Sequence, residues 1–107
     1  MDLKRRKCKP CEGGTKPMDR KESHKYLRLV RGWKLQGKNI SKEMKFKDFK
    51  NAISFVGKVA NIAESEGHHP DICLHDWNRI KLTLSTHAIK GLSINDFIMA
   101  SKVDSIK

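Results

Sequence analysis

Closely spaced histidines are the feature of this chain that most directly suggests chemistry. Three of its five histidines fall within eight residues, at positions 68, 69 and 75 of the stretch GHHPDICLHDW. Imidazole titrates close to neutral pH and its neutral form is a common metal ligand, so these groups can transfer protons or bind a metal ion. A metal site, an acid/base pair and ordinary surface histidines are the alternatives to be separated.

A metal site is the least favoured of these alternatives. A catalytic zinc ion commonly takes three protein ligands and a water, and His68, His69 and His87 would supply three by number. Neighbouring residues of an extended segment point to opposite sides, however, so His68 and His69 would chelate one ion only with a distorted backbone. Cys8 and Cys11 form a C-x-x-C motif without a second pair, which favours a plain N-terminal arm over a zinc or redox site.

A long helix is predicted immediately before the histidines. Asp48 can cap its first turn, and the helix should end at Gly67, a residue that readily adopts a left-handed C-terminal conformation. Because a residue before proline is pushed out of the helical region, His69 should be extended. The apolar residues that recur at helical spacing are Phe49, Ala52, Ile53, Val56, Val59, Ala60 and Ala63.

A β-hairpin is predicted after the histidines. Residues 72–76 and 80–87 alternate apolar and polar side chains around a turn near Asn78. A register that places Leu74 opposite Leu82 aligns the apolar rows of both strands, whereas a shift of one residue would mix them. In that register Ile72 lies opposite Leu84 and Asp76 lies opposite Ile80.

The same register brings three histidines together. Extended beyond the start of the hairpin, it places His69 opposite His87, with His68 one residue away at the end of the helix. His75 falls toward the opposite end of the hairpin and is interpreted as a surface histidine. Histidines on two sides of a cleft suit acid/base catalysis, which needs a proton donor and an acceptor near one small molecule.

The remaining segments complete an α+β fold. Residues 1–17 lack apolar periodicity and are predicted to be an irregular arm, and residues 18–107 to form a single domain. The order α-β-β-α-β-β-α predicts a four-stranded antiparallel sheet that buries one face under three helices. The further elements expected are a helix at 20–31, a hairpin at 33–46 and a helix at 94–105 that a Ser93–Asp96 capping box would begin.

Charge is concentrated in the first half of the chain. The net charge is +11, and residues 1–50 hold 17 Lys and Arg against 6 Asp and Glu, whereas the second half is balanced. Such asymmetry is typical of a surface that binds nucleic acid or an acidic partner, and equally of a solvated lysine-rich face, which we favour. No apolar run approaches the length of a membrane span, and we expect a soluble cytoplasmic protein with reduced thiols.

Several motifs together are specific enough to indicate a family. They are ESEGHHP (64–70), LTLSTH (82–87), GLS (91–93) and Asp96, with further agreement at CEGG (11–14), Trp33 and FKDF (46–49). The chain resembles the pterin carbinolamine dehydratase family, in its bacterial form, over most of its length. The resemblance implies the same α+β sandwich, with three helices on one side of the sheet, usually assembled as homodimers or homotetramers. It also implies that no metal or other cofactor is needed.

The resemblance further implies a reaction, the dehydration of 4a-hydroxytetrahydropterin to quinonoid dihydropterin. This step recycles the pterin cofactor of aromatic amino-acid hydroxylases, so such a hydroxylase is the expected pathway partner. His68 and His87 would be the acid/base pair, and His69 would hold and orient the pterin, so that the catalytic set is His68, His69 and His87. The substrate-binding set is Glu64, His69, Pro70 and Asp96.

Two members of the substrate-binding set also have simpler explanations. Glu64 could polarise an imidazole or be solvated, and Asp96 could serve the site or only cap the last helix. The sequence departs from its relatives in having Gly67 where some carry an acid and one residue more between His69 and His87 than the animal type. Animal members also bind a homeodomain transcription factor, so a protein-binding coactivator module that uses the basic half is the alternative function.

Overall fold

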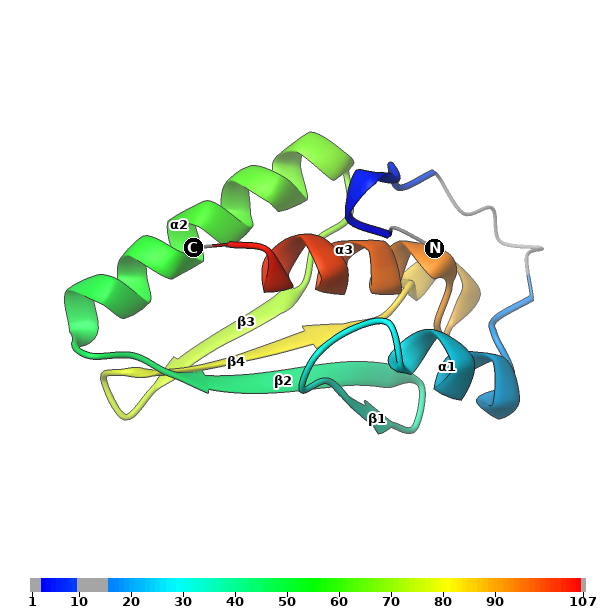
Figure 1. Ribbon diagram of the computed structural model, residues 1–107, viewed down its shortest axis with the longest axis horizontal. Coiled ribbons are helices and arrows are strands. Elements are labelled where there is room, and N and C mark those ends of the chain that lie inside the picture. The colour runs from blue at the N-terminus through cyan, green and yellow to red at the C-terminus, as the bar shows by residue number, and fades with distance from the viewer. Residues whose placement is uncertain (1–2, 10–15, 107) are drawn as a thin grey trace.

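The protein is an α+β sandwich in which the helices cover one face of a four-stranded antiparallel sheet, as predicted (Figure 1). The computed structural model describes residues 3–9 and 16–106. Its order of elements is η1 (Leu3–Arg5), α1 (Arg20–Leu27), β1 (Lys34–Gln36), β2 (Asn39–Lys45), α2 (Phe49–Glu66), β3 (Asp71–His75), β4 (Arg79–Leu84), η2 (His87–Ile89) and α3 (Ile94–Asp104). No helix in the described part of the chain is long and apolar enough to cross a membrane.

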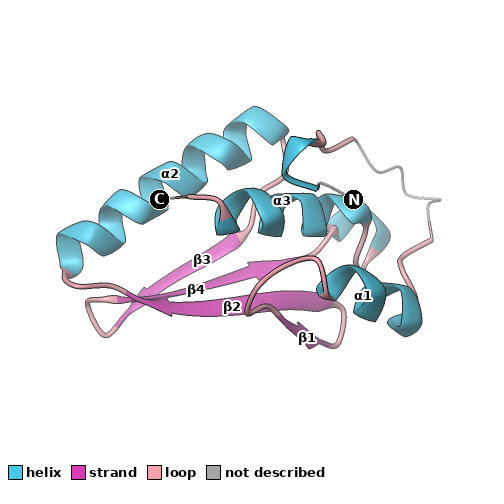
Figure 2. Ribbon diagram, viewed as in Figure 1, coloured by secondary structure: helices cyan, strands magenta, loops and turns pink. Residues whose placement is uncertain are grey.

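Helix α3 lies at the centre of the helical layer, above the sheet (Figure 2). It contacts α2, η1 and α1, and seven of its residues are buried. The strands run in the order β1-β2-β4-β3, and the inner strands supply the fully buried Ile40, Ile80, Leu82 and Leu84. Removal of these apolar side chains from water is the main stabilising contribution, and it fixes α3 over β2 and β4.

Helix α2 has the limits that the sequence predicts. The carboxylate of Asp48 accepts a hydrogen bond from the backbone N–H of Asn51 (2.8 Å) at its start. Gly67 ends the helix with a φ of 65°, a left-handed conformation that glycine adopts without steric strain because it lacks a Cβ. Its backbone N–H donates to the carbonyl of Ala63. The left-handed residue turns the chain away from the helix axis, so His68 begins a new direction directly at the helix end.

Helix α1 is shorter than predicted, since it ends at Leu27 instead of Arg31. The backbone N–H of Arg31 donates to Asp104 at the end of α3 (2.8 Å), and Val30 is buried in the core. Asp104 also accepts hydrogen bonds from Trp33 Nε1 (3.0 Å) and Lys42 Nζ (2.9 Å). These tertiary contacts draw residues 28–33 out of the helix, and Gly32 takes its positive φ in this loop.

The predicted register of the second hairpin was wrong by two residues. Ile72 lies opposite Leu82 and Leu74 opposite Ile80, because the turn falls one residue earlier, with Asp76 and Trp77 both at positive φ. A shift of two preserves which side chains share a face, so Leu74 still packs against the core. Strand β4 ends at Leu84, and His87 is therefore outside the ladder and has no strand partner at position 69.

Candidate active site

The three histidines predicted to converge line one pocket. The cavity has a volume of about 530 Å³ and lies where the end of α2, the connection from β4 to α3, and the N-terminal segment meet. A pocket of this size suits a bicyclic small molecule, since ligand pockets span roughly 300–1,000 Å³. Its lining comprises Cys8, Lys9, Glu66, Gly67, His68, His69, Pro70, Asp71, Ser85, Thr86, His87, Ala88 and Asn95.

His68 is held by a buried carboxylate. Its Nε2 lies 2.6 Å from Oδ1 of Asp96, whose side chain is fully buried, while 13% of the His68 side chain is exposed. The other oxygen of Asp96 accepts hydrogen bonds from Thr86 Oγ1 (2.9 Å) and the backbone N–H of Ser93 (3.0 Å). Asp96 thus completes the predicted capping box of α3 and also fixes the imidazole. Within the described residues Nδ1 of His68 makes no hydrogen bond, so this nitrogen remains for a ligand.

His69 pairs with Glu64. Its Nε2 lies 2.7 Å from Glu64 Oε2, and both side chains are largely exposed. The acidic residue four positions before His68 therefore contacts His69 and not His68. Exposed pairs of this kind contribute little to stability, about 0–1 kcal/mol, so its effect is on the orientation of the ring. Neither Glu64 nor Asp96 is among the described residues that line the pocket, and each reaches it through a histidine.

His87 lies in the pocket, but not on a strand opposite His69 as predicted. It begins η2, a single 3-10 turn that the backbone bridge between Thr86 and Gly91 closes (2.8 Å from Thr86 N to Gly91 O). The His87 side chain is exposed and makes no hydrogen bond to any other described residue. It is free to contact a ligand in the pocket that it lines.

His75 lies away from this site. Its Nε2 is 3.0 Å from Glu43 Oε1 and its Nδ1 is 3.1 Å from Asp76 Oδ2, at the far end of the hairpin. The prediction that it is a surface histidine is confirmed.

The N-terminal segment forms one wall of the pocket, which the sequence interpretation missed. The N–H of Cys8 donates to Glu66 (2.9 Å), the N–H of Lys9 donates to Oδ1 of Asn95 (3.0 Å), and Nδ2 of Asn95 donates to the Lys9 carbonyl (2.5 Å). Leu3 is buried against α3 and anchors the segment. Leu3, an apolar residue in an otherwise charged stretch, was the one feature of the sequence that could have predicted this anchoring.

The Cys8 thiol stays protonated in this wall. Burial, reinforced by the negative charges of Glu66 and Asp96, raises the pKa of Cys8 to about 12. The thiolate is the nucleophilic and metal-binding form, so at neutral pH Cys8 acts as a small neutral side chain. Cys11, the other half of the C-x-x-C motif, lies outside the described residues. Within the described ranges no three His, Cys, Asp or Glu side chains are grouped as metal ligands.

Comparisons with known proteins agree on one family. The family model described as pterin 4 alpha carbinolamine dehydratase matches residues 16–106. A relative from Nitrosomonas europaea, provisionally named pterin-4-alpha-carbinolamine dehydratase, is 46% identical over 98% of this chain and 93% of its own length. A relative from Azoarcus sp. (strain BH72), with the same provisional name, is 44% identical over 98% of this chain and 91% of its own.

Solved structures lead to the same family. A transcriptional coactivator/pterin dehydratase from Brucella melitensis superposes with a TM-score of 0.77 at 34% identity, covering 83% of this chain and 96% of that one. A pterin dehydratase-like protein described as a RuBisCO assembly factor of the alpha-carboxysome has a TM-score of 0.60 at 24% identity and shares the fold. By family model, relatives and fold, the chain belongs to the pterin-4a-carbinolamine dehydratase family.

Proposed function

We propose that the protein dehydrates 4a-hydroxytetrahydropterin to quinonoid dihydropterin and so recycles the cofactor of a cytoplasmic aromatic amino-acid hydroxylase. The observation that carries the proposal is the pocket in which His68, fixed by Asp96 at 2.6 Å, lies with His69 and His87. Family membership supports the same reaction.

The reaction removes water across a carbon–nitrogen bond. The bond from C4a to the hydroxyl oxygen breaks, the adjacent ring nitrogen loses its proton, and a double bond forms between that nitrogen and C4a. One histidine protonates the departing hydroxyl, which leaves as water, and the other accepts the proton from nitrogen. We assign these steps to Nδ1 of His68 and to the imidazole of His87. Neither Nδ1 of His68 nor the ring of His87 has a hydrogen-bond partner among the described residues, so both are available to the substrate.

The remaining predicted site residues are assigned supporting roles. His69, oriented by Glu64, and Pro70 hold the pterin at the mouth of the pocket. Asp96 positions His68 and does not touch the substrate, since both of its oxygens are already engaged by protein donors.

An assay of purified protein on freshly generated 4a-hydroxytetrahydropterin tests the function. Formation of the quinonoid product should exceed the spontaneous rate, and His68→Ala and His87→Ala should each lose about 10²-fold or more of the enhancement. His75→Ala is the matched control, because His75 lies at the other end of the hairpin. Rates at the spontaneous level for the wild type, or equal rates in all three variants, would contradict the proposal.

A protein-binding role is the second candidate. The Brucella melitensis relative is described both as a coactivator and as a dehydratase, and the basic first half of this chain offers a surface for an acidic partner. The double variant His68→Ala with His87→Ala can be expressed in a strain that lacks the gene. Rescue of that strain by the double variant would favour the protein-binding role, and rescue by the wild type alone would favour dehydration.

We also propose that the chain assembles as a homodimer or homotetramer. Phe49 and Ile53 lie one turn apart on α2 and are 51% and 47% exposed, which is costly for two large apolar side chains unless another surface covers them. Sedimentation of the wild type and of the double variant Phe49→Ser with Ile53→Ser tests this, and the double variant should sediment as a smaller species. A monomeric wild type at micromolar concentration would contradict it.

A further inference from the structure

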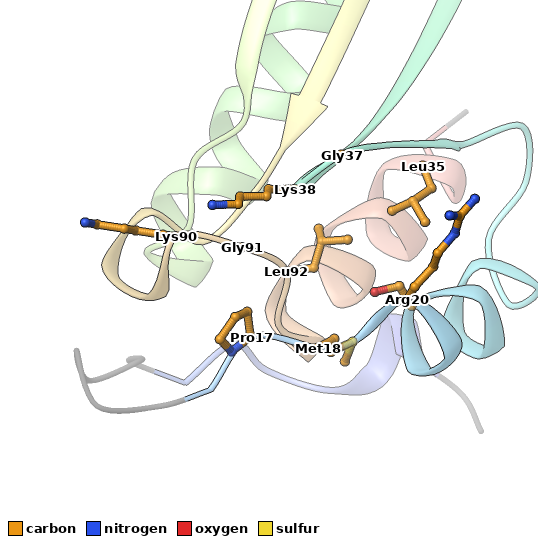
Figure 3. Close-up of a pocket in the computed structure, with 10 residues that line it drawn as sticks. Pro17, Met18, Arg20, Leu35, Gly37, Lys38, Lys90, Gly91 and Leu92 are labelled. Atoms are coloured by element: carbon orange, nitrogen blue, oxygen red, sulfur yellow. The ribbon is translucent and has the colours of Figure 1, made fainter.

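A second pocket lies on the other side of the loop that carries His87. It has a volume of about 490 Å³ and lies between the start of α1, the turn from β1 to β2, and residues 90–92 (Figure 3). None of its lining residues lines the histidine pocket. The loop from Thr86 to Gly91 joins the two, since it presents His87 to one pocket and Lys90 with Gly91 to the other.

The floor of this pocket is apolar. Met18, Leu35 and Leu92 line it, and Leu92 is only 3% exposed. Pro17 closes one side by close approach to Gly91, and the N–H of Met18 donates to the Leu92 carbonyl (2.8 Å). An occupant with an aromatic or aliphatic body would remove this floor from water.

Three cations line the pocket, on two sides of its apolar floor. In Figure 3 Lys38 and Lys90 extend on one side of Leu92 and Arg20 on the other. No acidic residue is among the described residues that line the pocket, and none of the three cations has an ion-pair partner in the described part of the chain. Lys38 and Lys90 are like charges on the same side of the pocket without a counter-charge, and an anion bound between them would relieve their repulsion.

One further observation distinguishes this pocket from an ordinary lysine-rich surface. Lys90 has φ of 54°, a left-handed conformation that is uncommon outside glycine and tends to occur at functional positions.

We propose that this pocket is a second binding site, for a small organic anion that combines a phosphate, carboxylate or sulfonate group with an apolar body. The apolar body rests on Met18, Leu35 and Leu92, and the anionic group is held by Lys38 and Lys90, which extend on the same side of Leu92. The proposal does not depend on the dehydratase activity, because the two pockets have separate linings.

Titration of the ¹⁵N-labelled full chain with phenyl phosphate, followed by NMR, tests the site. At about 0.15 M salt, where diffuse attraction is screened, saturable amide shifts should concentrate at Met18, Lys38 and residues 90–92. Because inorganic phosphate lacks the ring, it should bind at least about fivefold more weakly.

Two pairs of charge variants distinguish specific binding in this pocket from nonspecific attraction by the positively charged surface. Lys38→Gln with Lys90→Gln should raise the Kd for phenyl phosphate at least about fivefold, as expected for loss of two charge-assisted contacts. Lys47→Gln with Lys50→Gln removes the same charge from exposed positions outside the pocket and should change the Kd less than about twofold. Equal effects of the two pairs, equal affinity for both phosphates, or shifts centred on His68 and His87 would each overturn the proposal.

Discussion

Nε2 of His68 lies 2.6 Å from Oδ1 of Asp96, although 28 positions separate the two residues in the chain. The same carboxylate caps α3 through Ser93 and accepts from Thr86, next to His87. One buried group therefore connects the end of α2, the start of α3 and the loop that carries His87. The catalytic geometry proposed here depends on it.

Asp96→Asn should lower kcat and leave KM nearly unchanged, because Asp96 orients His68 without touching the substrate. The amide replaces one accepting oxygen by an NH2 donor, so the hydrogen bond to His68 is either lost or made with the other tautomer of the ring, and we expect a cost of at most about 1–3 kcal/mol in the free energy of unfolding. Dehydration kinetics and chemical denaturation measure the two effects. Glu64→Gln is the control, since it breaks only an exposed pair and should cost at most about 1 kcal/mol. Equal losses of kcat in both variants would contradict the positioning role.

Asn95→Ala should loosen the N-terminal wall of the histidine pocket. It removes both hydrogen bonds to the Lys9 backbone, and segment 4–9, which is rich in Lys and Arg, should become more accessible to trypsin. KM for the pterin should rise as the wall moves. Cleavage rates and KM should stay at wild-type values in Asn61→Ala, a change at an exposed position of α2. An Asn95→Ala chain that is as resistant as the wild type would rule out this function of Asn95.

Cys8 should be alkylated much more slowly than Cys73. Because burial raises the pKa of Cys8 to about 12, its thiol is almost entirely protonated at pH 8, and the thiolate is the reactive form. Cys73 is exposed. In a Cys11→Ser chain, iodoacetamide followed by mass spectrometry should show modification of Cys73 first, and the Cys8 rate should rise about tenfold per pH unit while the fold persists. Rapid modification of Cys8 at pH 8 would show that burial does not suppress its ionisation.

Gly91→Ala should destabilise the fold, because its new methyl carbon would lie 2.6 Å from Cβ of Pro17. Relief of that overlap requires the loop or Pro17 to move, at a cost of about 1–3 kcal/mol. Gly57→Ala has the opposite expectation: Gly57 is an exposed position within α2 with open space around it, and alanine there should stabilise by up to about 1 kcal/mol. Thermal unfolding of both variants checks the pair, and a Gly91→Ala chain as stable as the wild type would contradict the close contact.

Local signals in the sequence determined most of the elements. Asp48 and Gly67 predict both ends of α2 because a capping carboxylate and a left-handed glycine act on neighbouring backbone groups. The box formed by Ser93 and Asp96 predicts the start of α3 for the same reason. The alternation of the strands predicted which side chains share a face, and the family motif predicted the three histidines that line one pocket.

Contacts between distant segments decided what the pattern could not. A shift of two residues leaves each strand's apolar face unchanged, so the pattern could not select between the predicted register and the one in which Leu74 lies opposite Ile80. The early end of α1 depends on Asp104, and the wall built by Cys8 and Lys9 depends on Asn95. The sequence alone identified His68 and Asp96 and predicted the cap that Asp96 makes. Only the packing of α2 against α3 brought the two side chains within hydrogen-bonding distance, because that distance is set by the shared core beneath both helices.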